Sequence, residues 1–549
     1  MIMKKSKITL ITAAVAAAVM ALGACGASSS SSSSSSSAST DAVITAFGTE
    51  PENALIPANT NENSGGRVVD LLFAGLVGFD NDGNAKNEVA KSITPNDDNT
   101  KFDIELNDGW TFTDGTKVTS ESFTKAWSYA AVAANSQLNN SWFNIIKGYD
   151  ELQADGTASD AQLSGLTVTD DTHFSVELNS STSTFPIQVG YSAFYPLPES
   201  YYSDPDAFGQ NPVGNGSYKF KSWTHNQSIS LEKNDDYKGN FPAKNGGIEF
   251  KIYTDMDTAY ADVQAGNLDV MDGIPSSAAT TFESDSSVQA YNKPGASINT
   301  LLIPSALDHF GMNEEGRLRR AAISRAINRE QIVEKVLGGV GTPAVDYVTP
   351  KIAGYSENLT GNEVLKYDAD AAKQLWDQAN AISDWGNATF TMTYNADGGN
   401  KDLFDALANS IKNALGIDAV AAPIATFQQL RQEINNRSLK TAFRAGWMPD
   451  YPSAENYLKP LYSSAAADGN GANDGDYKNP DFDALLDKAA AAASTEDANK
   501  IYQQAEEILL QDLPAIPIYY KNNTGVTAQG VNGFTIKWNS LPSYRDLTK

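Results

Sequence analysis

The chain of 549 residues carries a formal net charge of −27 and a single cysteine, and these numbers exclude several classes of protein. So acidic a surface repels the phosphates of nucleic acids and of anionic lipids, which argues against nucleic-acid binding and against a basic membrane-binding patch. One cysteine cannot form an intramolecular disulfide, so the fold must rest on its hydrophobic cores, for which the chain is ample.

Residues 1–25 have the pattern of a secretory signal peptide. A lysine-rich start precedes an apolar stretch over residues 8–22, which is shorter than the roughly 20 residues of a membrane-spanning helix. The following Leu22-Gly23-Ala24-Cys25 resembles the lipobox of bacterial lipoproteins, in which the cysteine becomes the first mature residue. We therefore expect lipidation at Cys25. An ordinary signal peptide cut elsewhere, with Cys25 left as a free thiol, is the alternative.

Residues 26–40 are dominated by serine and offer nothing apolar to bury. We expect them to form a flexible tether. Behind a lipidated cysteine, such a tether would keep a globular body close to the membrane while letting it stand away from the surface. Beyond Asp41 the sequence contains no segment apolar enough to span a membrane.

The early part of the globular region is rich in strands and turns. Residues 102–106 alternate as a strand, and Asp-Gly pairs follow at residues 108–109 and 114–115. A helix comes next, with its expected N-cap at Ser120. Residues 166–180 have the pattern of a hairpin with two aspartates at its turn. We interpret this block as a separate α+β subdomain inserted within a first lobe.

Strands and helices alternate in the middle of the chain. Residues 248–253 predict a strand, residues 256–264 a helix, and residues 268–271 a second strand, an order typical of a βαβ unit. A second such unit begins with a strand at Thr389. Its helix is predicted within residues 401–416, because leucine and isoleucine side chains recur on one face before a terminal glycine.

Two consecutive helices are predicted between these units, within residues 314–338. Asn328, followed three residues later by Gln331, resembles a capping pair at the start of the second helix. Gly338 is expected to end that helix. The alternation of strands and helices therefore predicts an α/β protein, which we interpret as made of two lobes.

The sequence offers no recognisable catalytic or metal-binding machinery. His173, His225 and His309 each stand alone, and no metalloprotease, nucleophile-elbow, phosphate-loop or dinucleotide-binding motif occurs. Residues 79–88 lack the full spacing of a calcium loop, and residues 468–476 are more typical of a solvated acidic loop. We therefore predict that the protein is no enzyme and holds no metal or cofactor, and that a cleft between its lobes binds a ligand.

Several long segments, in matching order, resemble the motifs of the family 5 (oligopeptide and dipeptide) solute-binding proteins of ABC importers. Among them are "NPVGNGSYKFKSW" from Asn211 and "GWMPDYPSAENYLKPLY" from Gly446. The likeness covers nearly all of residues 41–549. It implies an α/β, two-lobed periplasmic-binding-protein-like fold (type II, cluster C) with an extra α+β subdomain inserted in the first lobe. The segments that carry the resemblance are residues 50–76, 91–127, 211–239, 319–350, 446–462 and 505–520.

The resemblance also implies the domain boundaries, with lobe crossovers near Ala296 and Tyr519. Lobe I is expected to combine parts from both ends of the chain, and lobe II to be continuous. The expected ranges are 41–76, 210–295 and 520–549 for lobe I, 77–209 for the inserted subdomain and 296–519 for lobe II.

In the family, the aspartate of the segment that resembles Gly446-Trp447-Met448-Pro449-Asp450-Tyr451 pairs with the free α-ammonium group of a bound peptide. The resemblance therefore implies Asp450 as the anchor for the ligand's amino terminus. This is physically apt, since a carboxylate accepts several N–H donors at once. Read without the family, Asp450 would more simply shape the turn before a helix that begins near Ser453.

Other candidate site residues follow from the same likeness. Trp447 is expected to line a side-chain pocket, and Arg444 matches a position that helps to form the pocket or meets a carboxylate. A loop from the first lobe, with Asn59, Asn61 and Glu62, is expected to line the cleft. No basic residue is assigned to the ligand's carboxyl terminus. The nearby candidates for that role are Arg431 and Arg437.

The implied function is capture of oligopeptides and their delivery to an ABC import permease. An oligosaccharide-binding member of the same family is one alternative, because tryptophan and tyrosine rings stack on sugars; a peptide-sensing or adhesive surface lipoprotein is another. We expect a monomer, anchored through Cys25 on the extracellular face of the cell membrane of a Gram-positive bacterium. The aromatic residues considered for sugar stacking are Trp110, Trp142, Trp447 and Tyr451.

Overall fold

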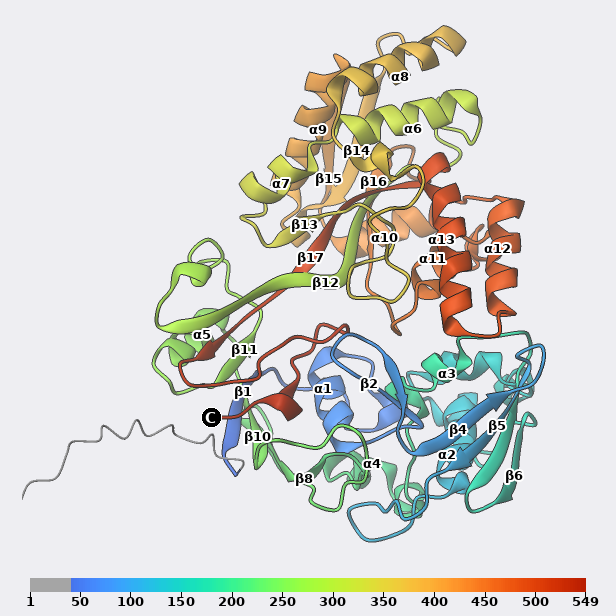
Figure 1. The fold of residues 1–549 in the computed structure, drawn as a ribbon, viewed down its shortest axis with the longest axis vertical. Helices are drawn as coiled ribbons and strands as arrows, with labels where there is room; N and C mark the ends of the chain where they lie inside the picture. The colour runs from blue at the N-terminus through green and yellow to red at the C-terminus, as the bar shows by residue number, and fades with distance from the viewer. Residues whose placement is uncertain (1–40) are drawn as a thin grey trace, which may run out of the picture. The chain divides into compact units, whose positions relative to one another are not determined.

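The computed structural model describes residues 41–549 (Figure 1). The predicted signal peptide, Cys25 and the serine-rich tether therefore lie outside the described residues. Within residues 41–549, no helix is both long and apolar enough to cross a membrane.

The main sheet has eleven strands, which come from both ends and the middle of the described residues. Its centre is a pair of long antiparallel strands, β12 and β17, which lie side by side in Figure 1. In spatial order the strands are β15 (Asp418–Ile424), β14 (Thr389–Asn395), β16 (Ala442–Trp447), β12 (Val288–Leu302), β17 (Ala515–Ala528), β11 (Val270–Asp272), β1 (Val43–Gly48), β10 (Gly247–Ile252), β9 (Ser228–Lys233) and β8 (Tyr218–Thr224), with β13 (Gly341–Pro343) added to β17.

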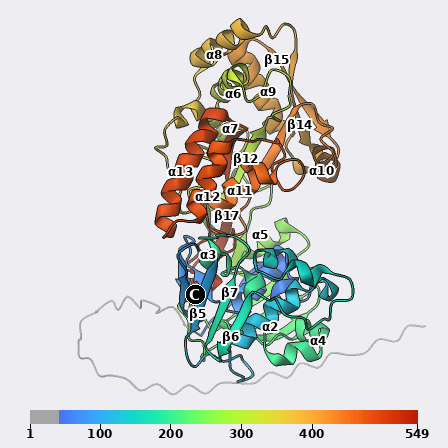
Figure 2. The ribbon, with the colours of Figure 1, turned by 90° about the vertical axis from the view of Figure 1, so that its right-hand side faces the viewer.

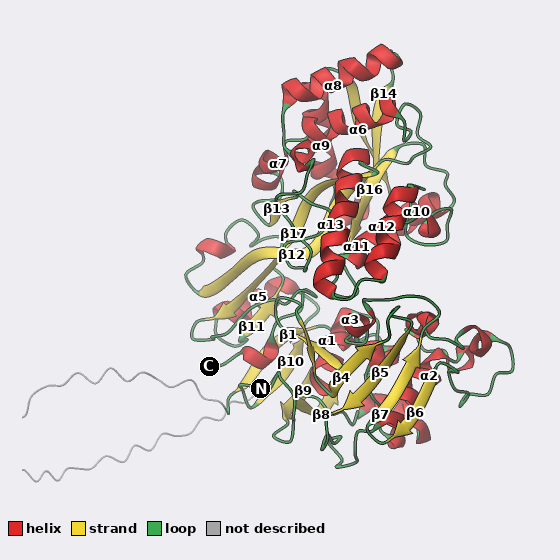
Figure 3. Cartoon of the chain, turned by 45° about the vertical axis from the view of Figure 1, so that its right-hand side comes forward, coloured by secondary structure: helices red, strands yellow, loops and turns green. Residues whose placement is uncertain are grey.

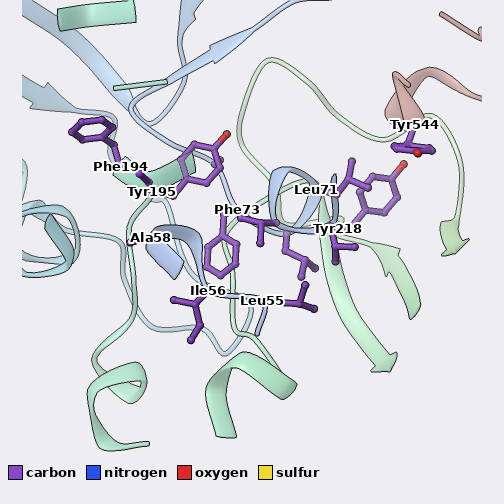
Figure 4. Close-up of a cluster of buried hydrophobic side chains, with 14 of the residues drawn as sticks. Leu55, Ile56, Ala58, Leu71, Phe73, Phe194, Tyr195, Tyr218 and Tyr544 are labelled. Atoms are coloured by element: carbon purple, nitrogen blue, oxygen red, sulfur yellow. The ribbon is translucent and has the colours of Figure 1, made fainter. Parts of the chain in front are cut away.

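Two hydrophobic cores flank this central pair and define two lobes. The first core gathers side chains from residues 44–288 and 526–547, and Figure 4 shows part of it around Phe73 and Tyr218. The second gathers side chains from residues 296–520, with Trp538 added from the end of the chain. Because β12 and β17 each contribute to both cores, the chain passes twice between the lobes. The residue ranges predicted for the lobes stay a prediction.

The first lobe carries a smaller sheet of its own, visible in Figure 3. Its strand order is β4-β5-β7-β6, all antiparallel, and a two-stranded hairpin of β2 and β3 precedes it. The elements are α1 (Asn63–Leu72), β2 (Val77–Phe79), β3 (Ala85–Asn87), β4 (Ala90–Pro95), β5 (Lys101–Leu106), α2 (Ser120–Ala131), β6 (Leu166–Asp170), β7 (His173–Glu177), α3 (Phe185–Gln188), α4 (Pro205–Gln210) and α5 (Met256–Gln264).

Eight helices build most of the second lobe's outer layers, and Figure 2 shows α12 and α13 among them. Helix α9 illustrates how they are held: Leu403, Leu407, Ile411 and Leu415 all point into the second core. Burying each such side chain contributes about 1.5–3 kcal/mol. The helices are α6 (Glu314–Ala326), α7 (Arg329–Lys335), α8 (Ala369–Ile382), α9 (Lys401–Leu415), α10 (Phe427–Asn435), α11 (Glu455–Tyr462), α12 (Pro480–Ala490) and α13 (Thr495–Asp512).

The predicted elements agree with the structure in kind and differ at some ends. Both βαβ units are confirmed, and Asn328 caps α7 by accepting the backbone N–H of Gln331. Two predicted helix ends are wrong. The N-cap of α2 is Thr119 rather than Ser120, because Thr119 and Ser122 form a reciprocal capping box. Helix α7 ends at Lys335, before Gly338.

Candidate ligand-binding site

A cavity of about 250 Å³ lies where the two hydrophobic cores meet. Segments far apart in sequence line it: residues 60–79 around α1 and β2, Glu88, residues 190–195 after α3, residues 237–241, the turn after β16, and residues 537–545 near the end of the chain. Among the lining residues are Thr60, Asn61, Glu62, Asn63, Asp70, Phe79, Glu88, Tyr191, Tyr195, Tyr237, Met448, Pro449, Asp450, Lys537, Trp538 and Arg545.

The turn after β16 is held by one side-chain amide. Asn456, at the start of α11, accepts hydrogen bonds from the indole of Trp447 (3.1 Å) and from the backbone N–H of Asp450 (2.8 Å). These bonds fix the chain as it leaves the strand. They leave Met448, Pro449 and Asp450 on the wall of the cavity.

Asp450 is an exposed carboxylate on the wall of the cavity, and no cation of residues 41–549 pairs with it. Its side chain lines the cavity, and within residues 41–549 it accepts one long side-chain hydrogen bond, from Asn456 (3.4 Å). Burial raises the pKa of Asp450 above its ordinary value, although the bond from Asn456 opposes this. Burial and the charge of Asp450 raise the pKa of Tyr191 to about 12. Within residues 41–549, Asp450 forms no ion pair, so its charge is available to a ligand.

The loop into α1 contributes both lining residues and a helix cap. Asn61 is exposed to the cavity, whereas the Glu62 carboxylate accepts the backbone N–H groups of Ser64 (2.6 Å) and Gly65 (2.9 Å). Glu62 therefore caps α1. Asn59 does not line the cavity, and its amide oxygen accepts the backbone N–H of Leu138.

Three further residues predicted for the site, Arg444, Gly446 and Trp447, lie on strand β16. Gly446 pairs with Asn299 across β16 and β12, and a Cβ there would lie 2.7 Å from the carbonyl oxygen of Ile298, so close strand packing requires glycine. Arg444 lies on β16 opposite Leu301, half-buried, with its Nε unpaired. Neither Gly446, Arg444 nor Trp447 is among the residues that line the cavity.

The aromatic side chains considered for sugar stacking are already packed against other rings. Trp142 stacks on Tyr191 (4.1 Å between centroids) and meets Tyr451 edge-on. Tyr451 is buried and donates a hydrogen bond to Glu455. Trp110 is buried against Tyr237. None of these three rings is among the residues that line the cavity.

The two arginines suggested for the ligand's carboxyl terminus are engaged elsewhere. Arg431 pairs with Asp474 (2.6 Å), and Arg437 pairs with Asp476 through two bonds of 2.9 Å. Both ion pairs lie in the second lobe, apart from the residues that line the cavity. The acidic loop at residues 468–476 therefore supplies the carboxylates that pair with Arg431 and Arg437. Within the described part of the chain, no cluster of three or more His, Cys, Asp or Glu could hold a metal ion.

Several lining residues were not found from the sequence. Asp70, on α1, pairs with Lys537 (2.7 Å) and lies 3.6 Å from Arg545. Burial raises, and the charges of Lys537 and Arg545 lower, the pKa of Asp70, with a net value of about 2. More than 460 positions separate these partners, so no local sequence pattern marks them.

The fold defines a class: a two-lobed α/β protein of the periplasmic-binding-protein type. The model of the bacterial extracellular solute-binding proteins, family 5, matches residues 84–469. This chain belongs to that family. Its members bind and transport solutes rather than catalyse reactions.

Relatives over most of the chain support the same assignment. The oligopeptide-binding protein OppA of Bacillus subtilis is 25% identical over 88% of each chain. A probable deoxycholate-binding periplasmic protein, YgiS of Escherichia coli, is 26% identical over 88% of each chain. Among solved structures, the periplasmic murein tripeptide-binding protein MppA in an unliganded open form gives a TM-score of 0.81 at 23% identity, covering 92% of this chain and 96% of that one.

Proposed function

We propose that this protein captures peptides with a free amino terminus in the cavity between its lobes and delivers them to the permease of an ABC importer. The observation that carries the proposal is Asp450. It is a carboxylate on the wall of the cavity that is exposed in the empty site and forms no ion pair within residues 41–549. A ligand that covers this carboxylate removes it from water, so the ligand must supply a partner for the charge. The α-ammonium group of a peptide is a cation with three N–H donors and would complete the site.

The comparisons favour a peptide over a sugar as the ligand. OppA is described as oligopeptide-binding and MppA as murein tripeptide-binding. A neutral sugar would leave Asp450 without a cation, and three of the four aromatic candidates are packed against other rings. YgiS, described as probably deoxycholate-binding, shows that relatives at similar identity differ in the ligands assigned to them. The oligosaccharide hypothesis is therefore retained only as a control in the experiments.

Substitution of the anchor tests the proposal. Asp450→Asn keeps the shape of the side chain and removes its charge, so affinity for a mixed peptide pool should fall by roughly 2–5 kcal/mol, the order found when a buried charge loses its partner. Calorimetric titration measures this loss. Asp160→Asn, an exposed carboxylate in the inserted subdomain, is the matched control and should leave the affinity unchanged. Equal affinities for the wild type and Asp450→Asn would refute the anchor.

The proposal includes a location. Lipidation at Cys25 and the serine-rich segment behind it would hold a monomer on the extracellular face of the cell membrane, close to its permease. Cys25→Ser should release the protein into the medium of a Gram-positive host, as measured by immunoblotting of membrane and medium fractions. Retention of Cys25→Ser in the membrane fraction would contradict lipid anchoring. Loss of peptide uptake on deletion of a co-encoded permease would distinguish import from a sensing or adhesive role.

A further inference from the structure

A buried polar junction joins the turn that carries Asp450 to the first lobe. Its centre is Glu455, at the start of α11, whose side chain is buried. The Oε2 atom of Glu455 accepts hydrogen bonds from the hydroxyl of Tyr451 and from the hydroxyl of Thr184 (3.2 Å). Tyr451 directly follows Asp450 in the chain, whereas Thr184 is the N-cap of α3. One carboxylate oxygen therefore contacts two distant parts of the chain.

The two sides of this contact belong to different hydrophobic cores. Phe185 of α3 packs in the first core, and Tyr457 of α11 packs in the second. Gln188, also on α3, donates from its amide to the hydroxyl of Thr184 (3.0 Å) and, through a longer bond, to that of Tyr451 (3.5 Å). The four side chains are each more than nine-tenths buried, and together they form what we call the interlobe junction: Thr184, Gln188, Tyr451 and Glu455.

The hydrogen bonds of the interlobe junction converge on the carboxylate. Gln188 supplies N–H donors to both hydroxyl groups, and each hydroxyl group donates its single hydrogen to Glu455. Burial, followed by the charge of Glu455, raises the pKa of Tyr451 well above its ordinary value, so the phenol keeps the proton that it donates. Each bond depends on the others, because a buried polar group that loses its partner is costly.

The other oxygen of Glu455 faces a cation. The Nζ atom of Lys459, one turn further along α11, lies 3.6 Å from Oε1. Lys459 is exposed, so it balances the charge of Glu455 without filling the junction. The Oε2 atom is left to the two hydroxyl groups.

Helix α11 holds both residues of the anchor turn. Asn456 accepts the backbone N–H of Asp450 (2.8 Å), and the neighbouring Glu455 holds the side chain of Tyr451. The ring of Tyr451 also meets Trp142, which packs against the first core, edge-on at 6.1 Å. Tyr451 is therefore fixed from both lobes. Because Tyr451 and Asp450 share a peptide bond, this constraint extends to the anchor.

We propose that Glu455 is a positioning residue for the peptide anchor Asp450. Thr184 and Gln188, from the first lobe, act on the anchor through Glu455. This inference rests on the proposed function, in which Asp450 binds the α-ammonium group of the peptide. A carboxylate that is held in place before the ligand arrives binds more tightly, because less conformational freedom is lost on binding. The anchor is thus complete only while both lobes contribute to the interlobe junction.

A double-mutant cycle tests this inference. Thr184→Val and Gln188→Leu nearly conserve the size of each side chain and remove its hydrogen-bond donors. Neither residue lines the cavity, so neither contacts a ligand there. The two substitutions are made singly and together, in the wild type and in the Asp450→Asn variant. Circular dichroism confirms the fold of each protein.

Each protein is titrated calorimetrically with a mixed pool of tri- to pentapeptides, in large excess so that the weaker affinities of the Asp450→Asn series are also measured. The wild type is titrated with the same pool acetylated at the amino terminus. Thr184→Ser, which keeps the hydroxyl group, is the conservative variant. Thr167→Val, at an exposed site on β6, is the matched control.

We expect Thr184→Val/Gln188→Leu to bind free peptides about fivefold or more weakly than the wild type, and the same pair of substitutions to change the affinity of Asp450→Asn by less than about twofold. Thr184→Ser and Thr167→Val should bind as the wild type does. If the combined variant does not fold, the two single variants are compared in the same cycle.

Equal losses of affinity in the wild-type and Asp450→Asn backgrounds would overturn the inference, because they would show an effect that does not pass through the anchor. Wild-type affinity in the combined variant would overturn it as well. If either result is found while the wild type still binds free peptides and not acetylated ones, peptide capture stands and the positioning role alone fails. Equal binding of free and acetylated peptides by the wild type would overturn both.

Discussion

At the scale of single residues, the structure separates two roles that the sequence leaves joined in Asp450. An aspartate between a strand and a helix commonly shapes the turn. Here Asn456 does most of that work, because its amide oxygen accepts bonds from both Trp447 and the backbone of Asp450. The carboxylate of Asp450 is consequently free to face the cavity. That distinction depends on side-chain geometry and could not be made from the sequence.

Binding through Asp450 should depend on pH. Burial raises the pKa of Asp450 in the empty site, and a bound ammonium group would lower it again. Binding therefore requires the ionised carboxylate, so affinity is fully present above the raised pKa and is lost as pH falls through it, by about tenfold per pH unit at the limit. Calorimetric titration between pH 7 and pH 4 measures this slope.

The control for the pH experiment is the Asp450→Asn variant, which cannot ionise at this position. Its weaker affinity should change less over the same range. Parallel pH profiles for the wild type and the variant would show that another group controls the dependence.

A second buried acid bears on stability rather than binding. Glu506, on α13, is fully buried beside Asp346. Burial, followed by the charge of Asp346, raises the pKa of Glu506 well above its ordinary value of 4.5. A raised pKa contributes stability that is complete below the unfolded-state pKa and is lost as pH rises toward the folded-state pKa.

Glu506→Gln should therefore reduce the loss of stability of the second lobe as pH rises from about 4.5, by up to about 1.4 kcal/mol per pH unit. Chemical denaturation followed by tryptophan fluorescence at several pH values measures it. Glu496→Gln, an exposed carboxylate on the same helix, is the control. Identical pH profiles for the wild type and Glu506→Gln would contradict this account.

At the scale of elements, the sequence predicts the helices and strands whose bounds and buried faces follow from their own local residue pattern. Helix α5 has the predicted bounds, and the predicted face of α9 is the buried one. Errors occur where two residues compete for one role, as at the start of α2, where Thr119 rather than Ser120 caps. Propensity does not distinguish adjacent serine and threonine residues at a helix start.

Helix α6 shows how a buried cation can join elements without an acid partner. Arg320 is fully buried and donates to the backbone carbonyls of Ile303, Phe310, Leu513 and Pro304. Burial lowers the pKa of Arg320 to about 9. The guanidinium thus joins α6 to the ends of β12 and α13, which no local sequence pattern indicates.

Arg320→Met should destabilise the second lobe by about 3 kcal/mol or more, because each buried carbonyl left unsatisfied costs about 1–3 kcal/mol. The midpoint of guanidinium denaturation measures the effect. Lys335→Met, exposed on α7, should change the free energy of unfolding by less than about 0.5 kcal/mol. A similarly small effect of Arg320→Met would show that the carbonyls find other donors.

At the scale of the whole molecule, contacts far apart in sequence build the site. The inserted subdomain reaches the end of α12 in the second lobe. The side chain of Asn99 and the backbone N–H of Ser183 both donate to the carbonyl of Ala490, and Asn99 also donates to the carbonyl of Ala492. These bonds satisfy carbonyls that a helix end leaves free. The C-terminal segment also reaches the cavity through a long-range contact. Lys537 of this segment pairs with Asp70, which lies more than 460 positions earlier in the chain, and both residues line the cavity.

The resemblance to family 5 supplied the fold, the location of the cleft and the segment around Asp450. It did not supply Lys537 and Arg545, and it suggested Arg431 and Arg437, which are engaged by Asp474 and Asp476. Resemblance to a family motif identifies candidate site residues only within the segment that matches the motif. Cations brought to a cavity by tertiary folding are visible only once the chain is folded.

The most direct test of peptide capture is a calorimetric titration of the purified protein with three sets of ligands: a mixed pool of tetra- to octapeptides, the same pool with acetylated amino termini, and a set of xylo- and cello-oligosaccharides. We expect binding heat from the free peptides, and loss of that heat on acetylation because Asp450 loses its cation. Heat from the oligosaccharides alone, or equal heat from free and acetylated peptides, would contradict it.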